Sequence, residues 1–481
     1  MTLQIVVFVA YFVLVFALGA FAMRLTRSED DYWIAGGRLG WLLGGATLAA
    51  THASAGTFIG TIGVIYTVGW SFSWLVLSIP IAYWFTAAVL APRFTRTREL
   101  TLPAFLESRY QSRAARALGA AIILIATVVY IQAQVVAGGL IANVVLGVPP
   151  LAGMVGFTLI LIVYTVAGGM IAVVYTDLLQ LVVMVLGAAL AVPLALHEAG
   201  GAGSLLAWVE AARPMAFRWD AMPGTLLFTM GLAFTLGSVA TPEKLIRLYA
   251  MKDLPTIRRG ILLAIVATTV MNLMVFVLAL CSIVLFPALP TGDLAMPMVA
   301  RAVLPPFLGA LLLAAVTAAM MSTVDSLLIV AGSALAHDIV GTLAPRFAAR
   351  RSHVWIARGG VVATGLVPLG LLLSGVGEGE LVQFIVLLFT ALMASSFFAP
   401  VVLGVLWKRA TRQGAISSMI LGVSTAFAWE LWGSESIDPV LPGFVVSMTA
   451  MVVVSLLTEP PPESALAPYW PTRAIDHQPR S

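Results

Sequence analysis

Hydrophobic runs of about twenty residues recur along the chain, with short polar segments between them. Thirteen such runs lie near residues 3–23, 40–66, 70–92, 116–146, 151–169, 171–196, 224–246, 258–286, 307–337, 354–374, 381–405, 413–432 and 440–457. A helix of this length matches the thickness of a bilayer. Helices also satisfy their own backbone polar groups, as lipid requires of a spanning segment. The pattern therefore predicts an all-α integral membrane protein with about 13 transmembrane helices.

The second run departs from a lipid-like composition because hydroxyl side chains recur along it. At steps of four, three, three and four, they share one face of a helix. These residues are Thr47, Thr51, Ser54, Thr57 and Thr61. His52, Gly56 and Gly60 also interrupt the run, and such residues allow a helix to unwind where its backbone lines a cavity. Freed carbonyls then coordinate a cation; the alternative is a helix packed closely on its neighbour through small residues.

The ninth run holds a polar cluster around a carboxylate. Ser322, Asp325 and Ser326 lie at i, i+3 and i+4, so they share a face, and Thr323 is one step round the helix. A carboxylate inside a span costs roughly 2.5–3.5 kcal/mol on insertion scales, so it usually serves a cation or a proton path. Hydroxyl oxygens suit a hard cation such as Na⁺. The alternative is a packing face whose Asp325 bonds to a neighbouring helix.

A second acid, Asp177, lies about two turns into the sixth run. Its structural alternative is a helix cap near the cytoplasmic mouth. Two carboxylates close together do not both stay ionised unless a cation sits between them. We therefore predict that a second Na⁺ lies between Asp177 and Asp325, or that Asp325 is protonated during part of a cycle.

Composition supports the membrane assignment, with 60% hydrophobic and 10% charged residues among 481. The balance of 26 Lys and Arg against 22 Asp and Glu needs no nucleic-acid partner, since basic loops are expected in an inner-membrane protein. With the N-terminus outside, 23 of the 26 Lys and Arg residues fall in inside segments, Lys244 and Arg247 among them, and only Arg213, Arg218 and Arg301 fall outside. The positive-inside rule then predicts an external N-terminus and a cytoplasmic C-terminus. Cys281 is the one cysteine, so no disulfide forms within the chain.

The predicted topology contains two units of opposite orientation. Runs two to six begin inside and span residues 40–196, whereas runs seven to eleven begin outside and span residues 224–405. Each unit opens with a segment rich in small residues, and the second such segment is 232–242. Paired interrupted helices of this kind indicate a transporter's binding site, although glycine-bearing helices also arise by chance. We expect one transmembrane domain over 1–458 and a polar, disordered cytoplasmic tail over 459–481.

Several motifs occur in order on these segments. They are Asp31-Tyr32-Trp33-Ile34-Ala35-Gly36-Gly37-Arg38, Tyr164-Thr165-Val166-Ala167-Gly168-Gly169 with Thr176-Asp177, Arg247 with Lys252-Asp253, and Ala318-Ala319-Met320-Met321-Ser322-Thr323. On these motifs the chain resembles the sodium:solute symporter family, which includes sodium-coupled sugar, proline, pantothenate and monocarboxylate carriers. The resemblance runs from Asp31 to about Arg409. It implies a leucine-transporter-like fold with two inverted five-helix repeats.

The resemblance also implies three groups of site residues. The family's common sodium site falls on the carbonyls of Ala50, Ala53 and Ala319 and the hydroxyls of Ser322 and Thr323. The second sodium site of some members falls on Thr51, Asp177, Asp325 and Ser326, where Asp325 replaces a hydroxyl. Substrate-facing positions fall on His52, Gly56, Thr57, Gly237 and Ser238. His52 is not a type that the family fixes; it helps to select the solute, or it bonds an unwound carbonyl as a structural residue.

We therefore expect a secondary active transporter that moves a small organic solute into the cell with Na⁺ by alternating access. A carboxylate, a proline-like compound or a pantothenate-like compound fits better than a sugar. The partners are the solute, sodium and the lipid bilayer, with no cofactor beyond the coupling ion. One alternative is a proton-coupled or uncoupled transporter of the same fold, against which Ser322 and Thr323 argue.

Two rival classes are less favoured. An intramembrane enzyme would need Asp177 and Asp325 as a dyad, but Thr323-Val324-Asp325 lacks the Gly-x-Gly pattern that precedes the second acid of such dyads. No His-Glu-x-x-His zinc motif occurs either. A membrane sensor usually carries a signalling domain, and the loops hold no inserted soluble domain. We therefore predict that the protein is not an enzyme.

Overall fold

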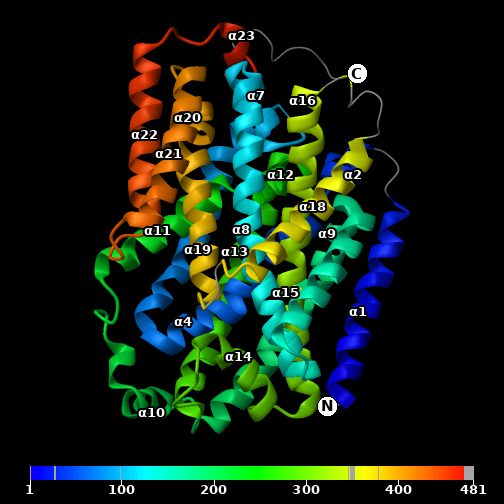
Figure 1. Cartoon of the computed structure of the whole chain (residues 1–481), viewed down its shortest axis with the longest axis vertical. Coiled ribbons are helices and arrows are strands. Elements are labelled where there is room, and N and C mark those ends of the chain that lie inside the picture. Colours follow the sequence, from blue (N-terminus) through cyan, green and yellow to red (C-terminus); the bar gives the residue numbers. More distant parts are fainter. Residues whose placement is uncertain are drawn as a thin grey trace.

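The computed structural model describes residues 2–25, 29–97, 99–344, 346, 353–376 and 379–470. Those residues form helices and no β-strand, apart from an isolated bridge between Leu39 and Met251. Most of the long helices run along the longest axis of the molecule (Figure 1). Helix α1 (Thr2–Met23) begins at one end of that axis, and α23 (Glu463–Leu466) lies at the other.

Each of the thirteen predicted runs falls on a helix or on a broken pair of helices. In the described residues, eleven helices are long and apolar enough to cross a membrane, and one bent pair adds a twelfth. The fifth run is the shorter apolar helix Pro150–Val166, which continues into the sixth through a kink at Gly169 (φ 75°). Proline at the helix start and glycine at the kink are the residues that these backbone conformations favour.

The elements that make up these spans are, after α1, the following in chain order. They are α3 (Trp41–His52) with α4 (Thr61–Val68), α5 (Ser78–Phe85) with α6 (Ala91–Phe94), α8 (Arg113–Leu146), α9 (Pro150–Glu198), α11 (Gly224–Ala240) with α12 (Pro242–Ala250), α13 (Leu254–Leu285), α15 (Pro306–Ser333), α18 (His353–Leu373), α19 (Val382–Met393) with α20 (Ala399–Leu406), α21 (Arg412–Trp432) and α22 (Val440–Leu457). Shorter helices in the connections are α2 (Glu29–Ile34), α7 (Leu102–Tyr110), α10 (Leu205–Ala212) and α14 (Ala295–Met298), whereas α16 (Gly341–Leu343) ends the span that begins with α15.

Two spans are broken in the same way, at the two stretches rich in small residues. Helix α3 ends at His52 and is followed by the extended residue Ala53 (φ −69°, ψ 123°), and α11 is separated from α12 by Thr241 (φ −73°, ψ 129°). Pro242 enforces the second break because it has no N–H to continue the helix. After the first break the chain re-enters a helix through a π-helical turn at Gly56–Gly60. The interruptions predicted from composition are therefore present at both places.

Helix α15 lies at the centre of the bundle and packs against α1, α3, α8, α9 and α18. In its membrane-crossing segment 83% of the residues are buried, against 22% in α1 at the periphery. Alanines such as Ala315 and Ala319 allow neighbouring backbones to approach closely, which is how helices associate in lipid. The buried polar cluster of α15 is thereby placed against the broken helix α3.

The tail differs from the prediction of a disordered segment beginning at Glu459. Tyr469 is fully buried, and its ring meets Phe105 of α7 edge-on at 5.8 Å between centroids. The guanidinium of Arg109 lies 5.6 Å from the centroid of the Trp470 ring. The two aromatic rings supply the apolar area that attaches this stretch to α7. The run of prolines before them suggests a disordered segment, so the sequence alone does not predict this contact. The remainder of the predicted tail, 471–481, lies outside the described residues.

Asp293 lies between spans, where a connection packs onto α4 and the start of α19. Its side chain is 4% exposed, and its Oδ2 accepts a hydrogen bond of 3.0 Å from the N–H of Val382. Its Oδ1 has no hydrogen-bond partner among the described residues, and a Cβ added at Gly63 would come within 2.7 Å of it. Burial raises the pKa of Asp293 to about 6.

We expect the stabilising contribution of Asp293 to be complete below about pH 4 and to fall as pH rises through 6, because the folded state binds the proton more tightly than the unfolded chain. Asp293→Asn keeps the acceptor for Val382 but cannot ionise. The variant should therefore gain thermal stability relative to the parent at pH 8, and the difference should narrow by on the order of 1–2 kcal/mol toward pH 5. Unfolding midpoints in detergent measure this. A difference that is equal at every pH would contradict it, and Asp220→Asn at an exposed acid should show no narrowing.

Candidate functional site

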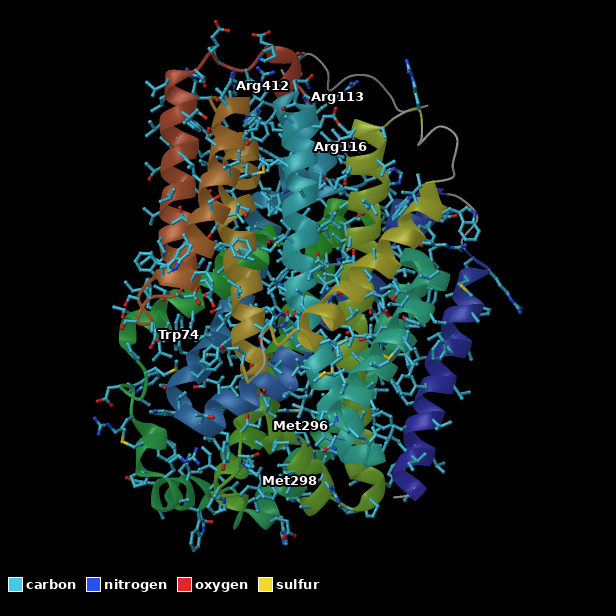
Figure 2. The ribbon with its side chains drawn as sticks, in the orientation of Figure 1. Trp74, Arg113, Arg116, Met296, Met298 and Arg412 are labelled. Carbon is cyan, nitrogen blue, oxygen red and sulfur yellow. The ribbon has the colours of Figure 1, made fainter. Side chains whose placement is uncertain are left out.

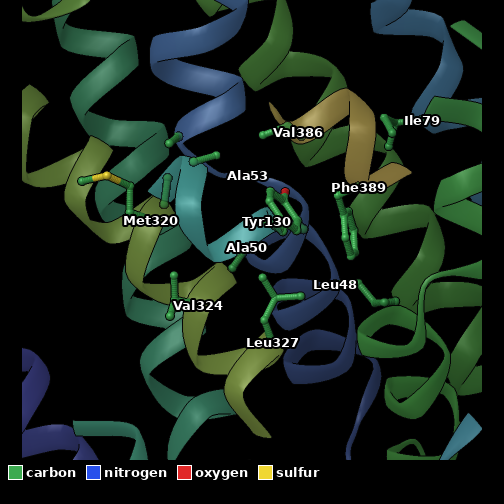
Figure 3. Close-up of a cluster of buried hydrophobic side chains, with 14 of the residues drawn as sticks. Leu48, Ala50, Ala53, Ile79, Tyr130, Met320, Val324, Leu327, Val386 and Phe389 are labelled. Atoms are coloured by element: carbon green, nitrogen blue, oxygen red, sulfur yellow. The ribbon is translucent and has the colours of Figure 1, made fainter. Parts of the chain in front are cut away.

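Five buried oxygen atoms converge where the break in α3 meets α15. The hydroxyl of Ser322 lies 2.9 Å from the carbonyl oxygen of Ala50 and 3.0 Å from that of Ala319. The hydroxyl of Thr323 lies 2.9 Å from the carbonyl oxygen of Ala53 and 3.0 Å from that of Ala319. Figure 3 shows this part of the bundle, with Ala50 and Ala53 labelled near Val324 of α15. The structure therefore brings together all five residues predicted for the common sodium site.

The chemistry of this cluster is that of a hard monovalent cation site. Its candidate ligand atoms are three carbonyl oxygens and two hydroxyl oxygens, and each has lone pairs that can face an ion. The break in α3 frees the carbonyls of Ala50 and Ala53 from a continuous helix. In the described part of the chain no three His, Cys, Asp or Glu side chains gather as a transition metal would need. These oxygens suit Na⁺, which prefers such ligands.

Arg247 lies inside the protein, which corrects the assignment of Lys244 and Arg247 to the segments on the cytoplasmic side. Both residues belong to α12, and the side chain of Arg247 is fully buried. The seventh span continues through the break to Ala250, so counting charged residues as loop residues is wrong here. A buried guanidinium is tolerated where its charge is paired and its N–H groups find acceptors.

The guanidinium of Arg247 finds its acceptors on three neighbouring helices. Its Nε donates to the hydroxyl of Thr47 at 2.8 Å. Its Nη2 donates to the hydroxyl of Ser326 at 2.5 Å and lies 3.3 Å from Oδ2 of Asp177. The hydroxyl of Thr47 donates to the same carboxylate oxygen of Asp177. A fixed positive charge therefore lies beside Asp177, where the sequence predicts a second cation.

The four residues predicted for the second cation divide into two groups. Thr51 lies 3.2 Å from Ser326 between their hydroxyl oxygens, and both join the group around Arg247 and Asp177. Asp325 instead accepts a hydrogen bond of 2.7 Å at Oδ1 from the hydroxyl of Thr165 on α9. Its Oδ2 is buried and has no hydrogen-bond partner among the described residues. Of the two acids predicted for the second cation, Asp177 has an ion pair among the described residues and Asp325 has none.

A cavity of about 60 Å³ lies at the two helix breaks. Four of the residues predicted to face the substrate line it: His52, Gly56, Thr57 and Ser238. Gly237 is not among the lining residues. A Cβ at Gly237 would come within 2.5 Å of the carbonyl oxygen of Thr390, so this glycine permits the close contact of α11 with α19.

Several further residues line the cavity but were not predicted from the sequence. Glu243, Lys244 and Gln383 supply polar atoms, and the rings of Tyr130 and Phe389 stack at 4.5 Å between centroids. Figure 3 shows these two rings side by side, near Val386. The signal for Glu243 and Lys244 is their position directly after Pro242 at the end of a stretch of small residues, where a broken helix exposes its new first turn.

The model of the sodium:solute symporter family matches residues 32–422, most of the chain. The chain belongs to the sodium:solute symporter family. Among relatives of this symporter, the high-affinity proline transporter PutP of Bacillus subtilis (strain 168) is 27% identical over 93% of this chain and 96% of its own length. The sodium/pantothenate symporter of Escherichia coli (strain K12) is 26% identical over 92% of this chain and 94% of its own length.

Solved structures support the fold of this symporter. A Na⁺-coupled sialic acid symporter in a substrate-bound, outward-open state aligns over 95% of this chain and 98% of its own, with a TM-score of 0.81 and 19% identity. Mhp1, a nucleobase-cation-symport-1 family transporter in a closed conformation, aligns over 92% of this chain and 99% of its own, with a TM-score of 0.58 and 14% identity. The leucine-transporter-like fold with inverted repeats is therefore confirmed, whereas the repeat bounds 40–196 and 224–405 stay a prediction.

Membership of the family also decides the broad class of function. The symporter is a multi-pass membrane transporter that couples a solute to sodium, and it is not an enzyme. The prediction of a transporter that uses Na⁺ as its coupling ion is confirmed at this level.

Proposed function

We propose that the protein moves a small organic solute into the cell together with Na⁺ by alternating access. The solute is a carboxylate, a proline-like compound or a pantothenate-like compound, as the proline and pantothenate carriers among its relatives suggest. One observation carries this proposal: the five-oxygen cluster and the cavity share the same break in α3. Ala53 contributes its carbonyl to the cluster, while its neighbours His52 and Ser54 line the cavity.

Coupling follows from that shared break. A sodium ion held by the carbonyls of Ala50, Ala53 and Ala319 and by the hydroxyls of Ser322 and Thr323 would hold α3 against α15. The position of His52 and Ser54 in the cavity wall then depends on the ion, so sodium and solute favour the same conformation. The energy suffices, because one charge moving through about 100 mV yields roughly 2.3 kcal/mol. A tenfold sodium gradient adds about 1.4 kcal/mol, and together they sustain a solute ratio of several hundred.

We also propose that the N-terminus lies outside the cell and the C-terminus in the cytoplasm. Figure 2 labels Arg113, Arg116 and Arg412 near one end of the molecule and Met296 and Met298 toward the other. Arginines concentrated at one end of a bundle support a cytoplasmic location of that end. The first helix begins at the opposite end (Figure 1).

The direct test is uptake by the purified protein in sealed vesicles. An inward Na⁺ gradient should drive accumulation of labelled proline or pantothenate, and a K⁺ gradient of the same size should not. Collapse of the membrane potential should reduce the accumulation, because a charge enters with the solute. Uptake that is equal in Na⁺ and in K⁺ would contradict sodium coupling.

We further propose that Asp325 takes up a proton during part of the cycle. Arg247 already balances the charge of Asp177. Of the two buried acids, only Asp325 therefore still needs a cation or a proton. The unpartnered Oδ2 of Asp325 is the atom that would carry the proton. A second sodium at Asp325 is the competing possibility, and stoichiometry separates the two.

We expect uptake to depend on pH in the parent and to lose that dependence in Asp325→Asn, with a Hill coefficient for Na⁺ near one in both. Uptake rates from pH 5.5 to 8.5 at several sodium concentrations measure this, with Asp220→Asn at an exposed acid as the matched control. A parent coefficient near two that falls to one in Asp325→Asn would assign a second sodium instead. A variant that matches the parent at every pH, with a parent coefficient near one, would leave Asp325 a structural residue.

A further inference from the structure

Two side chains of opposite charge lie together in the cavity wall without pairing with each other. Glu243 and Lys244 occupy the first turn of α12, directly after the break at Thr241 and Pro242. Both line the cavity, and their side chains are only 2% and 9% exposed. Consecutive residues of a helix point about 100° apart, so the two side chains reach different parts of the cavity. Among the described residues no ion pair within 4.0 Å involves either side chain.

Lys244 has unused capacity to donate hydrogen bonds. Its ammonium group lies 3.0 Å from the hydroxyl oxygen of Ser238, which also lines the cavity, and 5.8 Å from the centroid of the Tyr83 ring. An ammonium group carries three donors, and these contacts occupy one of them fully. A buried positive charge of this kind is costly until an anion meets it.

Glu243 has the complementary need. Its Oε2 is buried and has no hydrogen-bond partner among the described residues. The neighbouring guanidinium of Arg247 does not supply one, because its N–H groups go to Thr47, Ser326, Asp177 and the backbone carbonyl of Glu243. A buried carboxylate oxygen without a donor is likewise costly, so a donor that reaches Oε2 and an anion that reaches the Lys244 ammonium group would both lower that cost.

We propose that Glu243 and Lys244 bind the two charged ends of a zwitterionic solute. Lys244, with Ser238, binds the carboxylate of the solute, and Glu243 binds its ammonium or secondary ammonium group. The stacked rings of Tyr130 and Phe389, with Val386, cover the apolar part of the solute. This inference rests on the proposed transport function and narrows its solute class to amino or imino acids.

The charge of the cavity excludes the other solute classes. A simple carboxylate would satisfy Lys244 but would add a second negative charge beside Glu243, and a simple amine would do the reverse. A neutral polyol would leave both charges unpaired, which is the more costly outcome. A zwitterion pairs both groups and brings no net charge, so the solute adds nothing to the transferred charge.

The test compares probes of one shape and different charge. Sodium-dependent thermal stabilisation of the full-length protein in detergent is first measured with the twenty standard amino acids. For the best ligand, and for proline as a common reference, binding is then compared with the analogue lacking the amino group and the analogue lacking the carboxylate. For proline these analogues are cyclopentanecarboxylate and pyrrolidine. We expect the zwitterion to bind at least about 30-fold more tightly than either analogue, a difference of about 2 kcal/mol.

Two variants assign the two ends of the solute. Lys244→Met should weaken the zwitterion about 30-fold and reduce its advantage over the amine, whereas Lys244→Arg should restore part of the binding. Glu243→Gln should weaken the zwitterion and reduce its advantage over the carboxylate analogue. Lys252→Met, at an exposed lysine beyond the end of α12, is the matched control and should bind all probes as the parent does.

The outcomes separate this inference from the proposed function. If sodium stabilises the protein but no amino acid adds to it, or if the carboxylate analogue binds as tightly as the zwitterion, the zwitterion inference is wrong and sodium binding stands. If both variants lose thermal stability and bind every probe equally weakly, Glu243 and Lys244 are structural residues. If sodium itself has no effect on stability or uptake, the proposed function fails.

Discussion

Replacing Ser322 by alanine, or Thr323 by valine, is expected to raise the sodium concentration for half-maximal uptake by about ten- to a hundredfold. Each hydroxyl lies within 3.0 Å of two carbonyl oxygens in the five-oxygen cluster, so its loss removes one ligand from a buried ion. A hydrogen bond or ligand contact to a charged group is worth about 1.5–3 kcal/mol, which corresponds to that range. Solute affinity at saturating sodium should change far less, because the other ligands still hold the ion.

Two substitutions on the same helix serve as matched controls. Ser333→Ala and Thr317→Val remove hydroxyls that bond only to backbone carbonyls of their own helix, at 2.8 Å and 3.0 Å. Both should leave the sodium dependence at the parent value. Sodium titrations of initial uptake rate in vesicles measure the effect, and stability in detergent confirms that each variant is folded. Unchanged sodium dependence in both Ser322→Ala and Thr323→Val would remove this cluster from the coupling mechanism.

The second large effect is expected at Arg247. Arg247→Gln leaves Asp177 buried without its counter-charge, and removing one partner of a buried ion pair costs about 3–5 kcal/mol. Thr47 and Ser326 lose the donor that they share, which adds unsatisfied polar atoms to the same place. We expect a marked fall in the thermal unfolding midpoint and in the yield of folded protein. Both are measured in detergent without added solute.

A double variant makes this prediction sharp. Arg247→Gln combined with Asp177→Asn removes both charges, so it should recover part of the stability that either single change loses, by on the order of 1 kcal/mol or more. Arg218→Gln, at an exposed ion pair with Asp220, is the control and should change the midpoint little. Equal stability of the parent and Arg247→Gln would show that Asp177 needs no fixed positive partner.

Much of the fold follows from the sequence because lipid imposes a simple rule on apolar runs. Each predicted run corresponds to a helix or a broken pair, and even the two breaks are marked by glycine, proline and small polar residues. The tail was less accessible to prediction. Tyr469 and Trp470 follow three consecutive prolines, and their burial depends on α7, which is distant in sequence.

The candidate site was predictable where its residues lie on one helix face. Ser322 and Thr323 are adjacent, and their partners Ala50 and Ala53 follow from the resemblance to a known family. Charged residues were harder to place, because a single arginine or lysine near the end of an apolar run reads as a loop residue. The burial of Arg247 depends on its pairing with Asp177, seventy positions away in the sequence. A pattern of neighbouring residues cannot predict that pairing.

The breaks at Ala53 and Thr241 have a consequence for the movement between outward- and inward-facing forms. A continuous helix resists bending because each turn that opens gives up backbone hydrogen bonds. After Ala53 the N–H groups of Ser54, Ala55 and Gly56 bond to side chains instead of the preceding helical turn, and Thr241 is extended, so the half-helices can swing with less loss of helical bonds. Helix α15 carries no such interruption between Pro306 and Ser333 and should move as a rigid rod. The height of the barrier then depends on a few side-chain contacts across the breaks, such as the 2.9 Å bond from the Ala55 N–H to Gln134.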